Sequence, residues 1–382
     1  MIKKFIFVAK VAKEFFKKNR KNIQSNTILI NVSSTLCMKA AILDKSKIVI
    51  KDIVLPKIGK NEILIKMKAC GICGSDLEKV FGSYGMKSSR IGHEPVGEIV
   101  KVGKEITNFK KGDRVFVHHH VPCYACEFCY SGDFTMCEMY QSSNIEPCGL
   151  SEFILIPEWN VSRGGVAMIP DSISYEQAAL IEPVACCLRS IEKINIKKAD
   201  IVMIFGAGPT GLMHLILMKC SGVSQIIVVD INDFRLNFAK KIDPTITTIN
   251  VSESDKDLLK KKLTSIVGKN GVDKSIICTS SRTAFMQSLE STRRGGTISL
   301  FGVPPKDNQS VIDLNMIYSK ELKIIPSYAT SEKEIHQAIK LMENAIINLE
   351  PLITHKFNLV DSEMAFLCAH NANDSMKIII TS

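Results

Sequence analysis

The stretch DIVMIFGAGPTGLMHLILMKC, residues 200–220, decides the fold of one half of the chain. An apolar strand pattern leads into the hexapeptide GAGPTG, a helical pattern follows, and a second strand, QIIVVD, ends at Asp230. Glycines in such a turn let the backbone approach a pyrophosphate at a helix N-terminus, and the acid after the second strand can bind ribose hydroxyls. The candidate cofactor residues are therefore Gly206, Gly208, Pro209, Thr210, Gly211, Asp230 and Arg235.

The acidic residue also bears on which dinucleotide is bound. Asp230 would repel the 2′-phosphate of NADP, and the next two residues, Ile231 and Asn232, are uncharged, so the sequence favours NAD. Arg235 is the nearby cation that could instead accept a 2′-phosphate. A glycine turn that binds no ligand is the alternative interpretation of the motif.

The surrounding pattern predicts two kinds of sheet. From residue 200 onward, apolar strands alternate with amphipathic helices, which indicates a parallel sheet covered on both faces. Residues 38 to about 182 contain short β-like runs broken by Gly, Pro and Asn, which indicates a partly open antiparallel β domain. The tail has a helical pattern at 332–346, a weaker one after it, and a closing strand at 376–381. The predicted fold class is α/β and β.

Composition excludes several classes of protein. With 382 residues, 46% apolar and 23% charged, the chain resembles average globular proteins, and it has no apolar run of the roughly 18 residues that a spanning helix needs. Basic residues exceed acidic ones by 10, but most of that excess lies in residues 1–37. A nucleic-acid partner is therefore not expected, because its footprint should spread over the folded domain. Thirteen cysteines without a secretory signal indicate a reducing, cytoplasmic location.

Residues 1–37 form a basic N-terminal extension. Apolar residues between Phe5 and Phe16 fall at helical spacing, with lysines largely off that stripe, so a basic amphipathic helix is expected. The extension is either dispensable, or it is a transit or membrane-surface peptide; a transit peptide would target the protein to an organelle. We expect a chain that begins at Met38 to fold and turn over like the full one, because the β pattern starts there.

Two groups of residues have the spacing of metal ligands. Four thiols within fifteen residues suit tetrahedral Zn²⁺ in a closed structural site, with an iron–sulfur cluster as the main rival; they are Cys123, Cys126, Cys129 and Cys137. The segments CGICGSD (70–76), GHEPVGE (92–98) and IEP (181–183) supply the second group. Cys73, His93 and either Glu94 or Glu182 would leave one coordination position open, as in a catalytic zinc site.

In order and spacing, these motifs resemble the zinc-dependent medium-chain dehydrogenase/reductase superfamily over nearly all of residues 38–382. Glu182 stands where alcohol dehydrogenases have a second cysteine ligand, which is similar to sorbitol and other polyol dehydrogenases. Ser327-Tyr328 stands where sorbitol dehydrogenases have an Arg-Tyr pair. The resemblance implies a GroES-like catalytic domain at 38–183 and 325–382, a Rossmann NAD-binding domain at 184–324, and an active site in the cleft between them.

The resemblance implies that the protein transfers a hydride from a secondary alcohol of a polyol, sugar or cyclitol to NAD, with two zinc ions per chain. Ser75 is the expected first acceptor of the alcohol proton, and Glu78 is a second relay member or an exposed surface residue. The alternatives are L-threonine 3-dehydrogenase and a non-catalytic zinc- and NAD-binding protein. The expected partners are a small alcohol and further copies of the chain, as a dimer or tetramer.

Other cysteines and histidines are expected to be structural. Consecutive residues in a strand point to opposite faces, so His118, His119 and His120 should make a poor common site. Small buried apolar roles are expected for Cys70, Cys186, Cys187, Cys220, Cys278 and Cys368.

Overall fold

The computed structural model describes residues 36–82, 90–251, 256–304, 306 and 311–382. The amphipathic helix expected between Phe5 and Phe16 lies outside them. Within the described residues, no helix is both long and apolar enough to cross a membrane.

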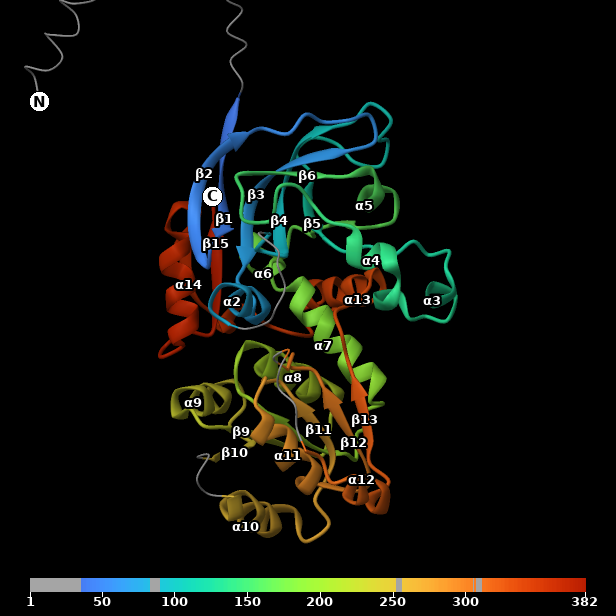
Figure 1. Ribbon diagram of the computed structural model, residues 1–382, viewed down its shortest axis with the longest axis vertical. Coiled ribbons are helices and arrows are strands. Elements are labelled where there is room, and N and C mark those ends of the chain that lie inside the picture. Colours follow the sequence, from blue (N-terminus) through green and yellow to red (C-terminus); the bar gives the residue numbers. More distant parts are fainter. Residues whose placement is uncertain (1–35, 83–89, 252–255, 305, 307–310) are drawn as a thin grey trace, which may run out of the picture. The chain divides into compact units, whose positions relative to one another are not determined.

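The second half of the chain forms the expected parallel sheet (Figure 1). Its strands are β8 (Ile201–Phe205), β9 (Gln225–Asp230), β10 (Thr247–Asn250), β11 (Val272–Ile277), β12 (Thr292–Leu300) and β13 (Lys323–Pro326). They pair in parallel in the order β10-β9-β8-β11-β12-β13. This is the 3-2-1-4-5-6 order of the dinucleotide-binding fold, in which ligands bind at the carboxyl ends of the strands, where the order reverses. The reversal falls between β8 and β11.

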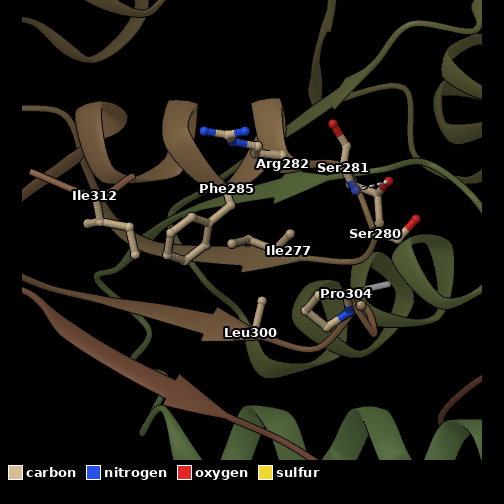
Figure 2. Close-up of a pocket in the computed structure, with 10 residues that line it drawn as sticks. Ile277, Ser280, Ser281, Arg282, Phe285, Leu300, Pro304 and Ile312 are labelled. Carbon is tan, nitrogen blue, oxygen red and sulfur yellow. Dashed lines mark hydrogen bonds between the residues drawn. The ribbon is translucent and has the colours of Figure 1, made fainter. Parts of the chain in front are cut away.

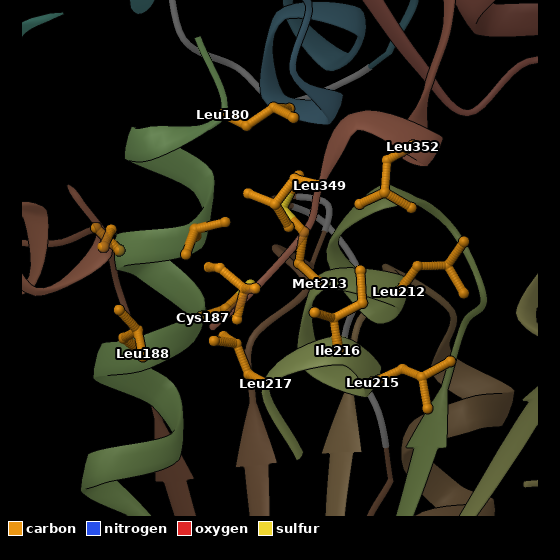
Figure 3. Packing of buried hydrophobic residues seen from close by; sticks show 14 of the residues in the cluster. Leu180, Cys187, Leu188, Leu212, Met213, Leu215, Ile216, Leu217, Leu349 and Leu352 are labelled. Carbon is orange, nitrogen blue, oxygen red and sulfur yellow. The ribbon is translucent and has the colours of Figure 1, made fainter. Parts of the chain in front are cut away.

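Helices connect these strands. They are α8 (Pro209–Ser221), α9 (Asp233–Ile242), α10 (Lys256–Val267), α11 (Arg282–Ser291) and α12 (Leu314–Lys320). A long helix that precedes the sheet, α7 (Ile181–Lys193), packs against α8, and Figure 3 shows Cys187 of α7 lying toward Met213 and Leu217 of α8. All three side chains are buried, so the contact between the two helices is stabilised mainly by apolar burial.

The first half of the chain and the C-terminal tail form a second, mostly antiparallel sheet. It contains β3 (Ile63–Gly71), β4 (Glu94–Val102), β5 (Arg114–Val117), β6 (Phe153–Ile156), β7 (Val166–Met168), β14 (Ile353–Asn358) and β15 (Lys377–Thr381). The order is β14-β15-β3-β4-β5-β7, with β6 paired to β3, and only the β14–β15 pair is parallel. A separate hairpin joins β1 (Cys37–Asp44) to β2 (Lys47–Val54). The antiparallel prediction is thus confirmed.

Helices of different lengths fill the connections of this half. They are α2 (Gly74–Phe81), α3 (Glu127–Tyr130), η1 (Phe134–Met136), α4 (Glu138–Ser142), α5 (Glu158–Ser162), α6 (Tyr175–Ala178), α13 (Glu332–Glu343), η2 (Glu350–Leu352), η3 (Leu359–Asp361) and α14 (Ser362–Asn371). The tail strand β15 hydrogen-bonds to β3, so residues distant in sequence complete one sheet. This pairing agrees with a catalytic domain built from two segments. The limits of these segments at 183 and 325 stay a prediction. The last strand of the parallel sheet, β13, extends to Pro326.

Candidate active site

Strand register brings the first two predicted zinc ligands together. Gly71 at the end of β3 pairs with Glu94 at the start of β4, so Cys73 and His93, just beyond these ends, become neighbours. Ligand atoms of Cys73, His93 and Glu94 all lie within 4.8 Å of one another. Thiolate sulfur, imidazole nitrogen and carboxylate oxygen are all ligands that zinc accepts, so this donor set fits the metal.

A buried carboxylate holds both ligand segments in place. Asp76 of α2 accepts hydrogen bonds from the backbone N–H groups of Cys73 (3.4 Å) and Gly92 (3.2 Å), and it lies 3.4 Å from Nδ1 of His93. Burial alone would raise the pKa of Asp76, but His93 and Lys79 lower it, so the group stays charged. A carboxylate on one ring nitrogen orients a metal-binding histidine and presents the other nitrogen to the metal.

The two candidate carboxylate ligands have different surroundings. Glu94 is fully buried, and Nζ of Lys377, reaching over from β15, lies 2.7 Å and 2.5 Å from its two oxygens. Burial would lower the pKa of Lys377, but Glu94 raises it, so the amine is charged and neutralises Glu94. Glu182, at the start of α7, accepts a hydrogen bond from the Cys186 thiol at 3.3 Å. Glu94 thus forms an ion pair with a lysine, whereas Glu182 has no such ion pair within the described residues.

One cavity of about 310 Å³ collects most of the predicted catalytic residues. It is lined by Cys73, Ser75, Glu78, His93 and Glu182 together with Thr210 of the glycine turn. Residues 278–280 and 301–303, which follow β11 and β12, close another side. The candidate metal ligands and the glycine turn thus share a cavity, while Glu94 is not among its lining residues.

The two proposed relay residues both line this cavity. Ser75 and Glu78 are three positions apart on α2 and thus occupy one helix face. Glu78 is half-buried, so its role as a second relay member or as a surface residue stays open. Its carboxylate lies along the end of α2, where a Cβ on Gly82 would come within 2.0 Å of Oε2.

The histidine run contradicts the prediction that its members alternate across a strand. Strand β5 ends at Val117, so the run lies in the loop that follows. His118 contacts Glu332 through Nδ1, at 2.8 Å, whereas His119 and His120 both line the cavity. Burial, followed by neighbouring imidazoles, lowers the pKa of His119, and burial lowers that of His120 to about 4. Both are neutral near pH 7 and can hydrogen-bond a polar ligand.

Two lining residues have unused polar atoms. Nδ1 of His119 and Oγ of Ser327 are buried and make no hydrogen bond within the described residues. Tyr328, next to Ser327, also lines the cavity. The sequence singled out Ser327-Tyr328 only because the pair replaces an Arg-Tyr pair. It did not predict a cavity position for His119, because the sequence does not show that β5 ends at Val117.

The glycine turn has the geometry that a pyrophosphate requires. Gly206 has a φ of +99°, and a Cβ on Gly211 would lie 1.9 Å from the Gly206 carbonyl oxygen, so both positions need glycine. Gly208 is open on its ligand side, where a Cβ would lie 3.8 Å from Nη1 of Arg235, the nearest side chain. Pro209 begins α8, whose N-terminus favours an anion.

Asp230 holds the backbone of the glycine turn. Its Oδ2 accepts a hydrogen bond from the Ala207 backbone at 2.6 Å, and Oδ1 accepts one from Asn232 at 2.9 Å. It lines a second cavity of about 230 Å³ together with Gly206, Gly208 and Arg235. The carboxylate thus fixes the turn and is available to a ribose in the same place.

A third cavity, of about 220 Å³, adjoins both others. It shares Thr279 with each of them. Figure 2 shows Phe285 of α11 and Leu300 of β12 pointing toward its apolar part, with Ser280 and Ser281 at one end. The loop after β11 therefore connects three cavities at the carboxyl edge of the parallel sheet, where this fold binds its ligands.

The four-cysteine segment forms a separate cluster. Ligand atoms of Cys123, Cys126, Cys129 and Cys137 lie within 4.8 Å of one another, and none of the four is in a disulfide. The sulfur of Cys129 lies 3.6 Å from that of Cys126 and 3.9 Å from that of Cys123. Two Zn–S bonds of about 2.3 Å at a tetrahedral angle span about 3.8 Å, so the cluster fits zinc. None of its members lines the three cavities.

Some predictions for the remaining cysteines are wrong. Cys220 is exposed at the end of α8, and Cys278 and Cys368 are only half-buried. Cys186 and Cys278 line the metal-ligand cavity. The expectation of buried, structural cysteines holds for Cys70 and Cys187.

A dinucleotide turn and an open set of zinc ligands facing one cavity define a zinc-dependent oxidoreductase. Two family models match the chain: the alcohol dehydrogenase GroES-like domain at residues 59–170 and zinc-binding dehydrogenase at residues 209–344. The chain belongs to the zinc-dependent medium-chain dehydrogenase/reductase superfamily, and its GroES-like and Rossmann fold class is confirmed.

Individual relatives indicate that the reaction is the oxidation of an alcohol. Sorbitol dehydrogenase of Bacillus subtilis (strain 168) is 32% identical, over 90% of this chain and 97% of its own length. L-threonine 3-dehydrogenase of Burkholderia mallei (strain SAVP1) is also 32% identical, over 85% and 93%. A solved structure described as a short chain alcohol dehydrogenase of E. coli CFT073, complexed with NADH, has a TM-score of 0.79 and 25% identity, covering 91% of this chain and 99% of that one. This protein is a zinc-dependent alcohol oxidoreductase.

Proposed function

We propose that the protein oxidises a secondary alcohol group of a polyol, sugar or cyclitol with NAD. The observation that carries this proposal is the pair of unused polar atoms in the cavity, Nδ1 of His119 and Oγ of Ser327. A buried polar atom without a partner costs about 1–3 kcal/mol, which a ligand with several hydroxyls removes. The similarity to a sorbitol dehydrogenase supports the same class of substrate.

We assign the catalytic zinc to Cys73, His93 and Glu182, which line the cavity together. Glu94 lies close enough to the other two ligands, but its charge is already compensated by Lys377. We therefore give Glu94 a positioning role behind the site. When bound, zinc supplies positive charge that makes the alcohol hydroxyl more acidic. The Ser75 hydroxyl, which both donates and accepts, is placed to take up that proton.

Replacing Ser75 with alanine is expected to lower turnover by about 10² or more, because a positioned proton acceptor is lost. Glu78→Gln should have a smaller effect and shift the pH profile, and Glu78→His should be tolerated. Steady-state rates across pH measure all three variants. Ser142→Ala, an exposed serine outside the cavity, is the matched control. A Ser75→Ala enzyme with unchanged rates at every pH would remove Ser75 from the relay.

Replacing Asp230 with serine is expected to raise the use of NADP relative to NAD. Removing a unit charge about 4 Å from a phosphate is worth roughly 1 to 4 kcal/mol, so the ratio should change several-fold or more. Serine keeps an acceptor for the Ala207 N–H that Asp230 now holds. Asp230→Asn removes the negative charge but keeps a hydrogen-bond acceptor, so it distinguishes the effect of the charge from that of the hydrogen bond. The ratio of kcat/KM values for the two cofactors is the readout, and a parent enzyme indifferent to the cofactor would make Arg235 the next position to test.

The proposed activity is tested by NADH formation from NAD with a panel of polyols, sugars, cyclitols, L-threonine and simple alcohols. Preference for a polyhydroxy compound supports the proposal. Preference for L-threonine would favour threonine 3-dehydrogenase. The cavity residues Glu78 and Lys79 have opposite charges, which would match the ammonium and carboxylate groups of that substrate. Lys79, however, already lies 3.5 Å from Asp76 and bonds the Arg90 carbonyl. Zinc and NAD binding without turnover of any alcohol would indicate a non-catalytic protein.

We also propose a homo-oligomer that assembles through β13. Among the described strands, β13 pairs only with β12, so its other edge is open. Exposed apolar residues on and before α12, Val311, Leu314 and Tyr318, lie beside it in sequence. An open strand edge can pair with its own copy across a twofold axis. Light scattering should show a dimer or tetramer that Tyr318→Lys weakens; a monomeric parent chain would contradict the proposal.

A further inference from the structure

Three further potential metal ligands lie outside both clusters described above. His355 is on β14, Cys368 is on α14, and Asp374 is in the connection between α14 and β15. One ligand atom from each lies within 4.8 Å of the other two. None of the three lines the cavities described above.

Hydrogen bonds hold the segment that carries Asp374 against the elements that carry the other two side chains. Oγ of Ser375 donates to the Cys368 carbonyl at 3.2 Å. The backbone N–H of Met376 donates to Oγ1 of Thr354 at 2.9 Å, next to His355. The two residues that follow Asp374 are thus tied to Cys368 and to the neighbour of His355, which keeps the Asp374 segment beside both partners.

One ring nitrogen of His355 has a hydrogen-bond partner, and the other is available to a metal. Nδ1 of His355 lies 3.0 Å from Oγ1 of Thr354, which also accepts the Met376 N–H and has two lone pairs. With Nδ1–H donating to this hydroxyl, the free lone pair is on Nε2. A hydrogen bond to the other ring nitrogen is the usual support of a metal-binding histidine.

Accessibility and donor chemistry favour a metal over a reactive thiol. His355 and Cys368 are half-buried and Asp374 is exposed, so an ion can enter and keep water as a fourth ligand. Sulfur, imidazole nitrogen and carboxylate oxygen together suit Zn²⁺ better than Mg²⁺ or Ca²⁺, which prefer oxygen. In the described part of the chain no hydrogen bond joins the thiol of Cys368 to His355, as thiol activation by that imidazole would require.

We propose that His355, Cys368 and Asp374 bind a third zinc ion, which fastens the end of α14 to the β14–β15 pair. This site has one ligand fewer than the four-thiolate cluster and an exposed carboxylate. It therefore holds its ion less tightly and fills only when zinc is supplied. The proposal does not depend on which alcohol the enzyme oxidises.

The test is equilibrium dialysis of the full chain against added Zn²⁺, followed by metal analysis. The parent should bind one zinc per chain more than Cys368→Ser and one more than Asp374→Asn, whose side chain is exposed and safe to change. Cys220→Ser, another accessible thiol, is the control and should match the parent. Because only differences between variants are counted, the other two zinc sites cancel. Equal stoichiometry in parent and variants would overturn the proposal.

A second measurement requires no change to the thiol. Zinc should slow alkylation of Cys368, followed residue by residue by mass spectrometry, in the parent chain. In His355→Gln and Asp374→Asn this protection should be lost, while Cys220 should react at the same rate with and without zinc. Alkylation of Cys368 at one rate regardless of zinc would also overturn the proposal.

Discussion

Cys73→Ser is expected to reduce alcohol oxidation at least about 10³-fold, because the catalytic metal and its positive charge are lost. Serine is a favoured N-cap residue, and Cys73 is the N-cap of α2, so the helix should remain. The buried Asp76, which holds this segment to Gly92, is also left in place. Circular dichroism should therefore be unchanged while metal analysis shows one zinc fewer.

The control for this prediction is again Cys220→Ser, which removes an exposed thiol far along the chain and should leave turnover unchanged. Steady-state kinetics with the best alcohol of the panel, together with zinc content, measure both variants. A Cys73→Ser protein that keeps its zinc and more than a tenth of the parent rate would exclude Cys73 from the ligand set.

The features that the sequence predicted correctly are those whose signals are local. The turn between β8 and α8 and the acid at the end of β9 lie within 31 residues, and backbone geometry explains the glycines at positions 206 and 211. The four thiols from Cys123 to Cys137 span fifteen residues, so one small lobe is enough to bring them together. Such motifs can be recognised without knowing how distant segments of the chain pack.

The features that the sequence did not reveal depend on strand register over long separations. Lys377 reaches Glu94, 283 positions away, only because β15 pairs with β3 and β3 with β4. No pattern near either residue in the sequence predicts this ion pair, which is the reason that we propose Glu182 rather than Glu94 as the carboxylate ligand. The cluster of His355, Cys368 and Asp374 likewise requires β14, α14 and β15 to be packed before the ligands meet.

The histidine run shows how a small boundary error changes a functional conclusion. Had β5 continued through residues 118–120, alternate side chains would have faced away from each other. The strand instead ends at Val117, directly before the run, and His119 and His120 both line the cavity. Strand ends are set by tertiary hydrogen bonding rather than by propensity, so sequence alone does not locate them.

Cys126→Ser is expected to release the second zinc and to lower the melting temperature. The lobe has few buried apolar residues of its own: Cys129, Cys137 and Tyr140 form its small core. Structural zinc in small peptides contributes roughly 10–16 kcal/mol to folding, an upper limit here, so loss of one thiolate should unfold the lobe locally. Thermal unfolding and metal analysis together measure the effect.

The same change should lower turnover moderately, although no lobe cysteine lines the active cavity. Tyr140 donates to the Thr330 carbonyl at 2.8 Å, and the Tyr124 hydroxyl donates to Glu332, which also holds His118. Unfolding of the lobe therefore loosens the histidine loop beside the cavity. Phe128→Ser, in the same lobe but exposed and not a ligand, should keep both zinc ions and the parent melting temperature. A Cys126→Ser protein with full zinc content and unchanged unfolding would contradict a closed four-thiolate site.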